Sequence, residues 1–336
     1  MQYLNQVVRG DALKILAQLP ENSVDAIITD PPYFRVKNES WDRQWSDVQE
    51  YLEWLDCVAG QWQRILKQNG SLYCFASPQM AARVELLLGQ RFNVLNRITW
   101  NKSKSGGRHS SCCKEHLKRF FYASETIIFC ESLQNDYHAR CSSLHSDIFE
   151  PLRAYLAGER KRGRFTAKQI IKATRCYTVE RHAFARCQFE LPTQQRYRLL
   201  QQAFPGYFER PYNQLKHQYD QLKQKYNQLK QQYKRLRRPF KASPEAPYTD
   251  VWEFPPVPYY PGKHPCEKPL SLIGHIIRTS TRSGWVVLDP FAGSGTTAVA
   301  AIATGRNYIA VEQNPDYCEV AEGRISEALQ SAKAPR

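Results

Sequence analysis

The sequence predicts an α/β fold: a doubly wound, mostly parallel sheet with a mainly helical and basic segment inserted into it. Two short apolar runs of strand character, Val24–Thr29 near the start and Trp285–Leu288 near the finish, each lead directly into a loop. Helical patterns alternate with further runs of this kind, as in βαβ units. A length of 336 residues suits one large domain of this class plus an insertion of about 100 residues.

The elements follow one another in a regular order. Residues 5–35 read as a strand, a short helix from Ala12 to Leu19 and the strand that ends at Thr29. Residues 50–69 form an amphipathic pattern with Tyr51 and Trp62 on its apolar face. A buried strand over 70–75, a helix over 79–88 and strands over 93–100 and 126–130 complete the first half. The loops that leave parallel strands at their carboxyl ends should therefore meet at one rim of the sheet.

The first of these loops is Asp30-Pro31-Pro32-Tyr33. Proline fixes φ and has no N–H, so the carbonyl oxygens of Asp30 and Pro31 remain free to accept hydrogen bonds. A carboxylate and an oriented carbonyl suit the two hydrogens of an exocyclic amine, and Tyr33 offers a face on which a base can stack. Taken alone, the segment fits a strand-terminating proline turn with a solvated aspartate equally well.

The second loop runs from Asp289 to Thr297 and is rich in small residues. Gly293 and Gly295 permit positive φ and remove the Cβ atoms that would keep a ligand from the backbone. A helix pattern follows from Thr296, and its free N–H groups favour a polar or anionic group. Glu312 ends the next apolar strand, where doubly wound nucleotide folds hold a ribose diol. A lone tight turn is the plain alternative, but the order strand, loop, helix, strand and acid favours a nucleotide-like ligand.

With both loops described, the chain resembles the amino-group DNA methyltransferases of the β order, in which the Asp-Pro-Pro-Tyr segment precedes the recognition region and the cofactor loop comes last. The resemblance implies a Rossmann-like methyltransferase sheet, S-adenosyl-L-methionine as cofactor and N6-methyladenine as the usual product. It implies a catalytic set of Asp30, Pro31, Pro32 and Tyr33. It also implies a cofactor-binding set of Asp11, Ala12, Asp30, His264, Lys268, Asp289, Phe291, Ala292, Gly293, Ser294, Gly295, Thr296, Thr297, Glu312 and Gln313.

A narrower similarity connects the middle of the chain with phage- and prophage-borne adenine methyltransferases. It rests on Trp41-Asp42, Leu191-Pro192-Thr193, the segment from Tyr233 to Phe240 and the segment from Pro247 to Trp252. Some members of that group modify adenine with little sequence preference. The similarity therefore leaves open whether a recognition sequence or a cognate endonuclease exists.

The mechanism that follows from this resemblance has the target base flipped out of the duplex, because a stacked base cannot present its amine to a bound cofactor. Asp30 and the Pro31 carbonyl would hold the amine while its nitrogen attacks the sulfonium methyl. Asp30 favours adenine over cytosine-N4, where serine commonly leads the tetrapeptide, and over protein-glutamine methyltransferases, which carry asparagine there. RNA as the substrate, and a non-catalytic DNA-binding protein on the same scaffold, are the remaining alternatives.

The positive charge is concentrated in the insertion. The chain has a formal charge of +15, while residues 151–241 hold 22 Lys or Arg and five acids, a net of +17. The remainder is therefore close to neutral, at about −2. Such segregation favours a nucleic acid partner for the insertion, and we expect double-stranded DNA.

These patterns divide the chain into residues 1–150 as the catalytic half, 151–241 as the target-recognition region and 242–330 as a linker and the cofactor half. Residues 163–204 are a candidate helix-turn-helix, with a plain helical hairpin as the alternative. Residues 212–238 form a heptad helix, whose stripe consists of Tyr212, Leu215, Tyr219, Leu222, Tyr226, Leu229, Tyr233 and Leu236. Three partners are possible for the stripe: a second subunit in a homodimer, other helices of the insertion, or DNA. The tyrosines favour packing within the insertion.

Candidate DNA contacts fall in a basic loop that starts at Lys102 and in the insertion. The predicted residues are Lys102, Lys104, Arg108, Lys114, Arg175, Arg181, Arg235, Arg237 and Arg238. The same loop carries His109, Cys112, Cys113 and His116, but adjacent cysteines suit few zinc-finger spacings, so we expect no metal. The ten cysteines lack Cys-x-x-Cys pairs, and no stretch of 18 apolar residues or signal pattern occurs. We expect reduced thiols, no membrane contact and a cytoplasmic location in a bacterial or phage-infected cell.

Overall fold

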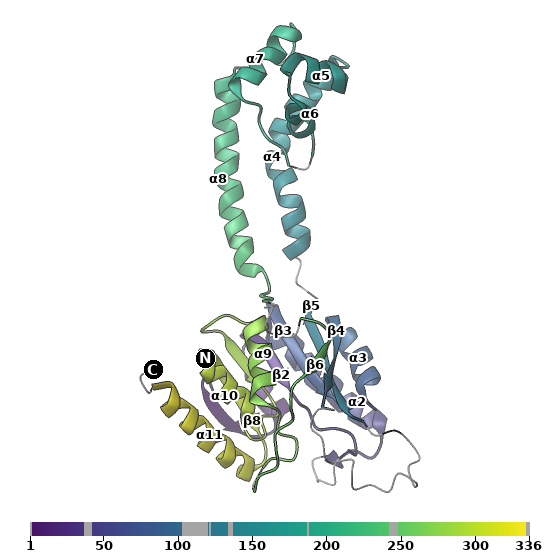
Figure 1. Ribbon diagram of the computed structural model, residues 1–336, viewed down its shortest axis with the longest axis vertical. Coiled ribbons are helices and arrows are strands. Elements are labelled where there is room, and N and C mark those ends of the chain that lie inside the picture. The colour runs from purple at the N-terminus through teal and green to yellow at the C-terminus, as the bar shows by residue number, and fades with distance from the viewer. Residues whose placement is uncertain are drawn as a thin grey trace. The chain divides into compact units, whose positions relative to one another are not determined.

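The computed structural model describes residues 2–36, 42–102, 120, 122–133, 137–186, 188–241, 248–261 and 263–333. They form two compact units, which we call the sheet unit (Met1–Asn135 and Arg238–Arg336) and the helical unit (Asp136–Arg237) (Figure 1). The predicted boundary at residue 150 is wrong, because helix α4 (Tyr137–Arg162) continues through Pro151 and belongs wholly to the helical unit. With these limits the helical unit holds 21 Lys or Arg and eight acids, a net charge of +13.

The sheet unit contains an eight-stranded sheet in the order β1-β8-β7-β2-β3-β5-β4-β6. β5 runs antiparallel to both of its neighbours, and the other pairs are parallel. The strands are β1 (Gln6–Arg9), β2 (Val24–Thr29), β3 (Leu66–Ala76), β4 (Phe92–Asn101), β5 (Ser124–Ser132), β6 (Val251–Glu253), β7 (Val286–Asp289) and β8 (Asn307–Glu312). The predicted doubly wound α/β fold is confirmed.

The pairing of β2 with β7 brings the two ends of the chain together. Ala26 lies beside Val287 and Ile27 beside Leu288, in parallel register. The side chain of Asp25 strengthens this junction, because it accepts a hydrogen bond from the Val286 amide (2.9 Å) and pairs with Lys67 of β3 (2.8 Å). The loops after β2 and β7 therefore leave the same edge of the sheet, at a topological switch point where such folds bind ligands.

Helices cover both faces of the sheet, and neighbouring residues along a strand point to opposite faces. Ile27 and Leu288 pack in a core with α1 (Ala12–Leu16), α2 (Val48–Ile65) and α3 (Ala81–Gly89). Ile28 and Val287 pack in a second core with α9 (Leu270–Ser280), α10 (Thr296–Ala303) and α11 (Pro315–Lys333). Central strands buried on both faces read as unbroken apolar runs, which is why the sequence identified β2 and β7.

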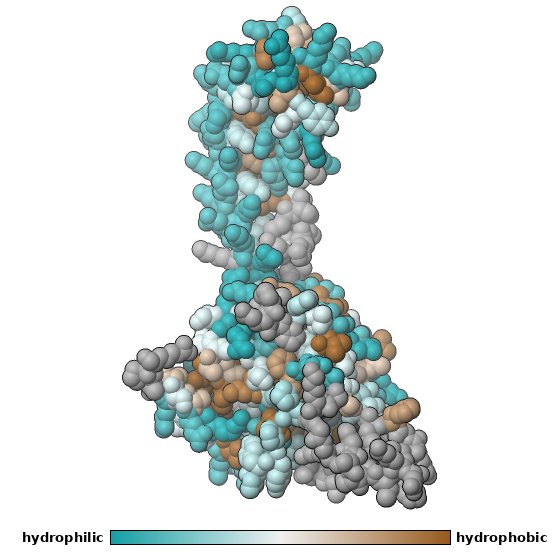
Figure 2. All heavy atoms as spheres, in the orientation of Figure 1, coloured by the Kyte–Doolittle hydropathy of each residue, from teal (hydrophilic) through white to brown (hydrophobic). Residues whose placement is uncertain are grey.

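The helical unit has a hydrophobic core of its own, built from α4, α5 (Ala167–Thr174), α6 (Tyr177–Ala183), α7 (Gln194–Ala203) and α8 (Tyr212–Leu236). α5 starts at a capping box, in which Thr166 and Gln169 bond each other's backbone N–H groups. Arg175 takes a left-handed conformation (φ 49°) and turns the chain from α5 into α6. The visible surface of this unit is mostly hydrophilic (Figure 2), as expected for a solvated basic module.

The heptad stripe of α8 packs within the helical unit. Tyr219 lies 5.3 Å from Phe149 between ring centroids, and Tyr226 lies 5.3 Å from His145. As the residue numbers rise along α8 they fall along α4, so the two helices are antiparallel (Figure 1). Tyrosines too bulky for a tight two-stranded coil thus fill the space beside the aromatic residues of α4. The homodimer remains a prediction without support from this stripe.

Parts of the predicted basic loop lie outside the described residues, including Lys104, Arg108, Lys114 and the His109–His116 cluster. Trp41 also lies outside them. Among the described helices, none has both the length and the apolar composition that a membrane span requires.

Candidate active site

A cavity of about 470 Å³ lies at the carboxyl ends of β2, β7 and β8. The catalytic loop after β2 and the glycine loop after β7 both line it, together with the segment around Lys268. All of the predicted catalytic and cofactor-binding residues line this cavity except Gly295. The central expectation, that residues some 260 positions apart in sequence share one pocket, agrees with the structure.

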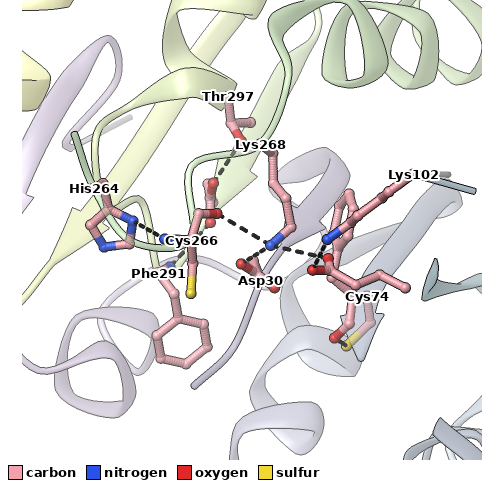
Figure 3. Close-up of polar contacts among 11 residues, drawn as sticks. Asp30, Cys74, Lys102, His264, Cys266, Lys268, Phe291 and Thr297 are labelled. Carbon is pink, nitrogen blue, oxygen red and sulfur yellow. Dashed lines mark hydrogen bonds and ion pairs between the residues drawn. The ribbon is translucent and has the colours of Figure 1, made fainter. Parts of the chain in front are cut away.

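Asp30 is the acid of the catalytic loop and is paired with Lys268. One carboxylate oxygen, Oδ2, accepts a hydrogen bond from the Lys268 ammonium, as Figure 3 shows. The other oxygen, Oδ1, is buried and has no hydrogen-bond partner among the described residues, and the same holds for the Tyr33 hydroxyl. Burial raises the pKa of Asp30, and the charge of Lys268 partly offsets this effect, as does the interaction of the Tyr33 hydroxyl with the Asp30 carboxylate. Asp30 thus keeps one acceptor available for a donor that enters the cavity.

The Lys268 ammonium is held by three oxygen atoms. Besides Asp30, it contacts the Cys266 carbonyl oxygen at 3.3 Å and Glu125 Oε2 at 3.5 Å. Burial opposes the charged form, but Asp30 and Glu125 outweigh this and raise the pKa of Lys268. Lys268 is therefore a fixed cation and cannot serve as the base.

Aromatic rings line the cavity beside these charges. Tyr33 is 7% exposed, and the Lys268 Nζ atom lies 5.7 Å from its ring centroid and 5.0 Å from that of Phe75. Trp54 of α2 packs against Phe291 of the glycine loop, with centroids 5.7 Å apart. Such flat surfaces suit planar ligands, including nucleobases.

The two glycines of the second loop have different roles. Gly293 has a φ of +50°, and a Cβ atom there would lie 3.1 Å from the His264 ring, where the loop lines the cavity. Gly295 has a φ of +76°, and a Cβ atom there would lie 2.8 Å from Ala321 Cβ. Gly295 therefore allows α11 to pack closely against the loop and does not line the cavity.

Asp289 fixes the start of the glycine loop. Its Oδ1 accepts the Phe291 amide (3.1 Å) and its Oδ2 accepts the Thr297 hydroxyl (2.6 Å). Burial raises the pKa of Asp289 to about 7, with these two hydrogen bonds opposing the rise. Thr297 therefore acts mainly by holding Asp289.

The predicted ribose acid, Glu312, faces the same loop from β8. Its Oε2 accepts the Gly293 amide and its Oε1 accepts the Asn314 amide, both at 2.8 Å. Asp11 follows β1, the strand on the other side of β8, and lines the cavity. It caps α1 by accepting a hydrogen bond from the Lys14 amide at 3.0 Å. Both carboxylates are thus fixed by backbone N–H groups at the cavity wall.

Several cavity residues were absent from the predicted set: Thr29, Gln44, Trp54, Phe75, Cys266, Glu267, Asn314 and Tyr317. For Trp54 and Phe75 the sequence pattern predicts only a place in a helix and in a buried strand. Cys266 and Glu267 lie inside the His264–Pro269 segment, so proximity to Lys268 was an available signal. Gln44 and Tyr317 offer no pattern that separates them from ordinary surface residues.

Arg324 of α11 is a further residue that the sequence did not single out. Its guanidinium donates to the Ser294 carbonyl oxygen (2.8 Å), the Ser294 hydroxyl (2.7 Å) and the Thr296 hydroxyl (3.1 Å). It also pairs with Glu267, at 3.4 Å. Arg324 thereby joins the glycine loop to the segment that carries Lys268, using the fork geometry that only arginine provides.

Replacing Arg324 with lysine is expected to weaken cofactor binding by roughly 10-fold, because lysine cannot donate to both loops at once. Isothermal titration with the cofactor would measure the loss. Exposed Glu322 on the same helix offers a control, since Glu322→Gln should leave affinity unchanged. Unaltered affinity in Arg324→Lys would contradict the positioning role.

The predicted DNA-contacting residues that the structure describes fall into three groups. Arg175 and Arg181 are exposed on the helical unit, Arg237 is exposed at its end, and Arg235 lies in α8. Arg238 instead pairs with Glu131 at 2.8 Å and stacks on Phe129 in the sheet unit. Lys102 pairs with Glu125 near the cavity and lies 4.3 Å over the Trp100 ring.

A doubly wound sheet, a glycine loop at its switch point and a buried carboxylate in the same cavity define an enzyme that uses a nucleotide-like cofactor. Residues 24–323 match the family model described as DNA methylase, which is named for N6 and N4 methyltransferases. This match covers most of the chain, and the protein belongs to the DNA methylase family.

Curated relatives agree with this assignment over nearly the whole chain. The DNA adenine methyltransferase YhdJ of Escherichia coli is 27% identical over 330 residues, covering 96% of this chain and 83% of the relative. The type II methyltransferase M2.MboI of Moraxella bovis is 25% identical, covering 96% of this chain and 87% of the relative.

Solved structures agree in fold. A putative DNA modification methylase of Thermus thermophilus, TTHA0409, has a TM-score of 0.51 at 20% identity, covering 97% of this chain and 95% of its own. The PvuII DNA methyltransferase, which is cytosine-N4-specific, has a TM-score of 0.52 at 14% identity, covering 98% and 95%.

Proposed function

We propose that this DNA methylase transfers a methyl group from S-adenosyl-L-methionine to the exocyclic N6 of an adenine flipped out of double-stranded DNA. The observation that carries the proposal is the free, buried oxygen of Asp30 in the same cavity as the glycine loop and Glu312. This shared cavity supports the proposal, because an amine acceptor and a cofactor site must lie within reach of each other. The curated relative YhdJ, named as a DNA adenine methyltransferase, supports adenine as the target.

The cavity fits the cofactor by its shape and donor set. Gly293 lacks a Cβ where the loop lines the cavity, and Glu312 presents a carboxylate suited to a ribose diol. Asp11, which follows β1 beside β8, suits a contact with the cofactor's adenine, as the family resemblance implies. A solved structure of M1.HpyAVI, 19% identical with a TM-score of 0.50, is a complex with SAM.

The chain's own residues perform the positioning. The cofactor supplies an electrophilic methyl group on a sulfonium. Asp30 Oδ1 and the Pro31 carbonyl oxygen accept the two N6 hydrogens, which orients the nitrogen lone pair away from both acceptors. Tyr33 provides the stacking face for the flipped base. Asp30 then stabilises the positive charge that develops on nitrogen and receives the proton that the methylated amine releases.

A test with labelled methyl donor and unmodified DNA, followed by nucleoside analysis, separates the candidate reactions. Label in N6-methyladenine supports the proposal, and label in N4-methylcytosine would overturn the choice of base. Label in RNA but not in DNA would overturn the substrate class. Binding of DNA without label transfer would support the non-catalytic alternative. Mapping of methylated positions on a long DNA then measures the sequence preference.

We further propose that the helical unit binds the duplex. Its net charge of +13, its separate core and the exposed arginines of the α5–α6 pair support this role. Since chromosomal or phage DNA is inside the cell, a DNA substrate agrees with the expected intracellular location.

Replacing Arg175 or Arg181 with glutamine is expected to weaken DNA binding. The slope of the logarithm of the binding constant against the logarithm of the salt concentration should fall by about one for each phosphate that the variant no longer neutralises. Fluorescence anisotropy over a range of salt concentrations measures both quantities. Arg83→Gln, which removes an exposed arginine of α3 in the sheet unit, is the charge-matched control. Identical salt slopes in all variants would remove these arginines from the DNA interface.

A further inference from the structure

Glu125 lies at the start of β5, a strand that carries none of the motifs described above. Its side chain reaches Lys268 and Lys102. Its carboxylate pairs with Lys102 on one side and lies 3.5 Å from Lys268 Nζ on the other. The side chain is 18% exposed, and its Oε2 has no hydrogen-bond partner among the described residues. Burial opposes its charge, but Lys268 and Lys102 outweigh burial and lower the pKa of Glu125. Glu125 is therefore an anion.

Four side chains form a row of alternating charge: Asp30, Lys268, Glu125 and Lys102. Figure 3 shows Lys268 beside Asp30, with Lys102 at the far end of the row. The formal charges of the row sum to zero. Lys268 consequently interacts with two carboxylates at once. Of the two oxygens of Asp30, it bonds only Oδ2.

We propose that Glu125 is a positioning residue for methyl transfer: it draws Lys268 away from Oδ1 of Asp30 and leaves this oxygen free to accept the substrate amine. The proposal rests on the proposed function of Asp30 and adds a residue outside both the catalytic loop and the glycine loop. Glu125 touches neither substrate nor cofactor in this arrangement, and it acts through Lys268.

The physical reason is a balance of charge. The methyl donor is a cation, and the amine nitrogen gains positive charge as it is methylated. Without Glu125, the four-residue row would carry a net charge of +1, and Lys268 would have Asp30 as its one carboxylate partner. Both changes oppose a cationic transition state, because the anion that should stabilise it would be neutralised.

Two titratable neighbours of Asp30 stay neutral whether or not Glu125 carries its charge. Burial raises the pKa of Tyr33 and of Cys74, so both remain neutral near pH 7. The remaining groups that face this part of the cavity are Asp289 on β7, Glu312 on β8, and His264 and Cys266 on the segment before α9. Asp289 also titrates in this range, because burial raises its pKa to about 7, so the opposite shifts expected in Glu125→Gln and Lys102→Met are what report the row.

The test uses single-turnover methyl transfer by the full-length enzyme, with DNA and S-adenosyl-L-methionine both saturating, over a range of pH. Glu125→Gln is expected to lower the rate about 10- to 100-fold. Asp30 must be unprotonated to accept the amine, so the rate rises with pH through its pKa. Loss of the Glu125 charge lowers that pKa and moves the acid limb of the profile to lower pH.

Lys102→Met should move the acid limb in the opposite direction. Removing the outer cation leaves an unbalanced anion beside Lys268, which raises the pKa of Asp30. Glu125→Asp keeps the charge and should restore the position of the limb. Glu131→Gln is the matched control, because it removes an ion-paired carboxylate from the same strand without touching the row, and rate and profile should stay as in the wild type.

Two outcomes would overturn the inference. Glu125→Gln with a wild-type rate and profile would show that Lys268 needs no second carboxylate. A slower Glu125→Gln whose acid limb does not move, with no opposite shift in Lys102→Met, would reduce Glu125 to a structural role. A wild-type enzyme that transfers no methyl group to DNA refutes the proposed function instead, so the two failures are distinguishable.

Discussion

Replacing Asp30 with alanine is expected to reduce methyl transfer by roughly 1,000-fold or more. The amine would lose the acceptor that orients its nitrogen, and the developing cation would lose its nearest anion. Cofactor binding should remain largely intact, because the glycine loop, Glu312 and Asp11 are held by contacts that do not include Asp30. Single-turnover labelling measures the first quantity and calorimetric titration of the cofactor measures the second.

Asp30→Asn serves as the companion variant, since it keeps the size of the side chain and removes its charge. It also leaves Lys268 with Glu125 as a partner, so folding should survive. Equal loss of transfer and of cofactor binding in both variants would assign Asp30 a structural role. A substantial residual rate in Asp30→Asn would point to the Pro31 carbonyl as the main determinant of amine orientation.

Replacing Glu312 with glutamine is expected to weaken S-adenosyl-L-methionine binding by roughly 10- to 100-fold, in the range of a lost charge-assisted hydrogen bond. Glu312 Oε2 accepts the Gly293 amide and Oε1 accepts the Asn314 amide, so the carboxylate is oriented before the ligand arrives. A glutamine retains one acceptor and loses the charge that a ribose diol prefers. Titration of the cofactor is the direct measurement.

A control for this variant is available on the neighbouring helix. Glu319 is exposed on α11, and Glu319→Gln removes the same charge away from the cavity. DNA affinity should be equal in both variants and the wild type. If Glu312→Gln bound the cofactor normally, the ribose would have to be held elsewhere, and the assignment of β8 as the ribose strand would fall.

Local pattern predicted the parts of the site that lie directly on strand ends. β2 and β7 are buried on both faces, so each appears as an uninterrupted apolar run, and Asp30 and Asp289 mark where each run stops. Glycines that permit positive φ, and an acid after the next strand, can also be recognised from the sequence alone. These features are local consequences of backbone geometry, and a sequence records them.

Glu125 and Arg324 could not be found in this way. Lys268 and Asp30 are 238 positions apart, and Glu125 joins them only because β5 inserts antiparallel beside β3. Arg324 appears as one charge on an amphipathic helix until the fold sets it against Ser294 and Thr296. Such partners depend on tertiary packing, which neither spacing nor composition specifies.

In the insertion, too, local features can be predicted from the sequence and tertiary contacts cannot. The sequence predicts the heptad helix α8 and a helical segment over 163–204, but it does not predict α4, and the predicted start at residue 151 lies about 15 residues inside the helical unit. The partner of the heptad stripe also required the structure. Tyrosine at every seventh position is compatible with several neighbours, and only the rings of Phe149 and His145 show which one is present.

The antiparallel packing of α4 and α8 has a consequence for how such enzymes diversify. The chain passes from the sheet unit into the helical unit after Asn135 and returns at Arg238. The first helix after the first of these points is α4, and the last helix before the second is α8, and these two helices are neighbours. The module between them carries its own core, so exchanging it leaves every strand of the sheet in its original order. The proposed DNA-binding unit can thus be exchanged without rearranging the strands that carry the active-site loops.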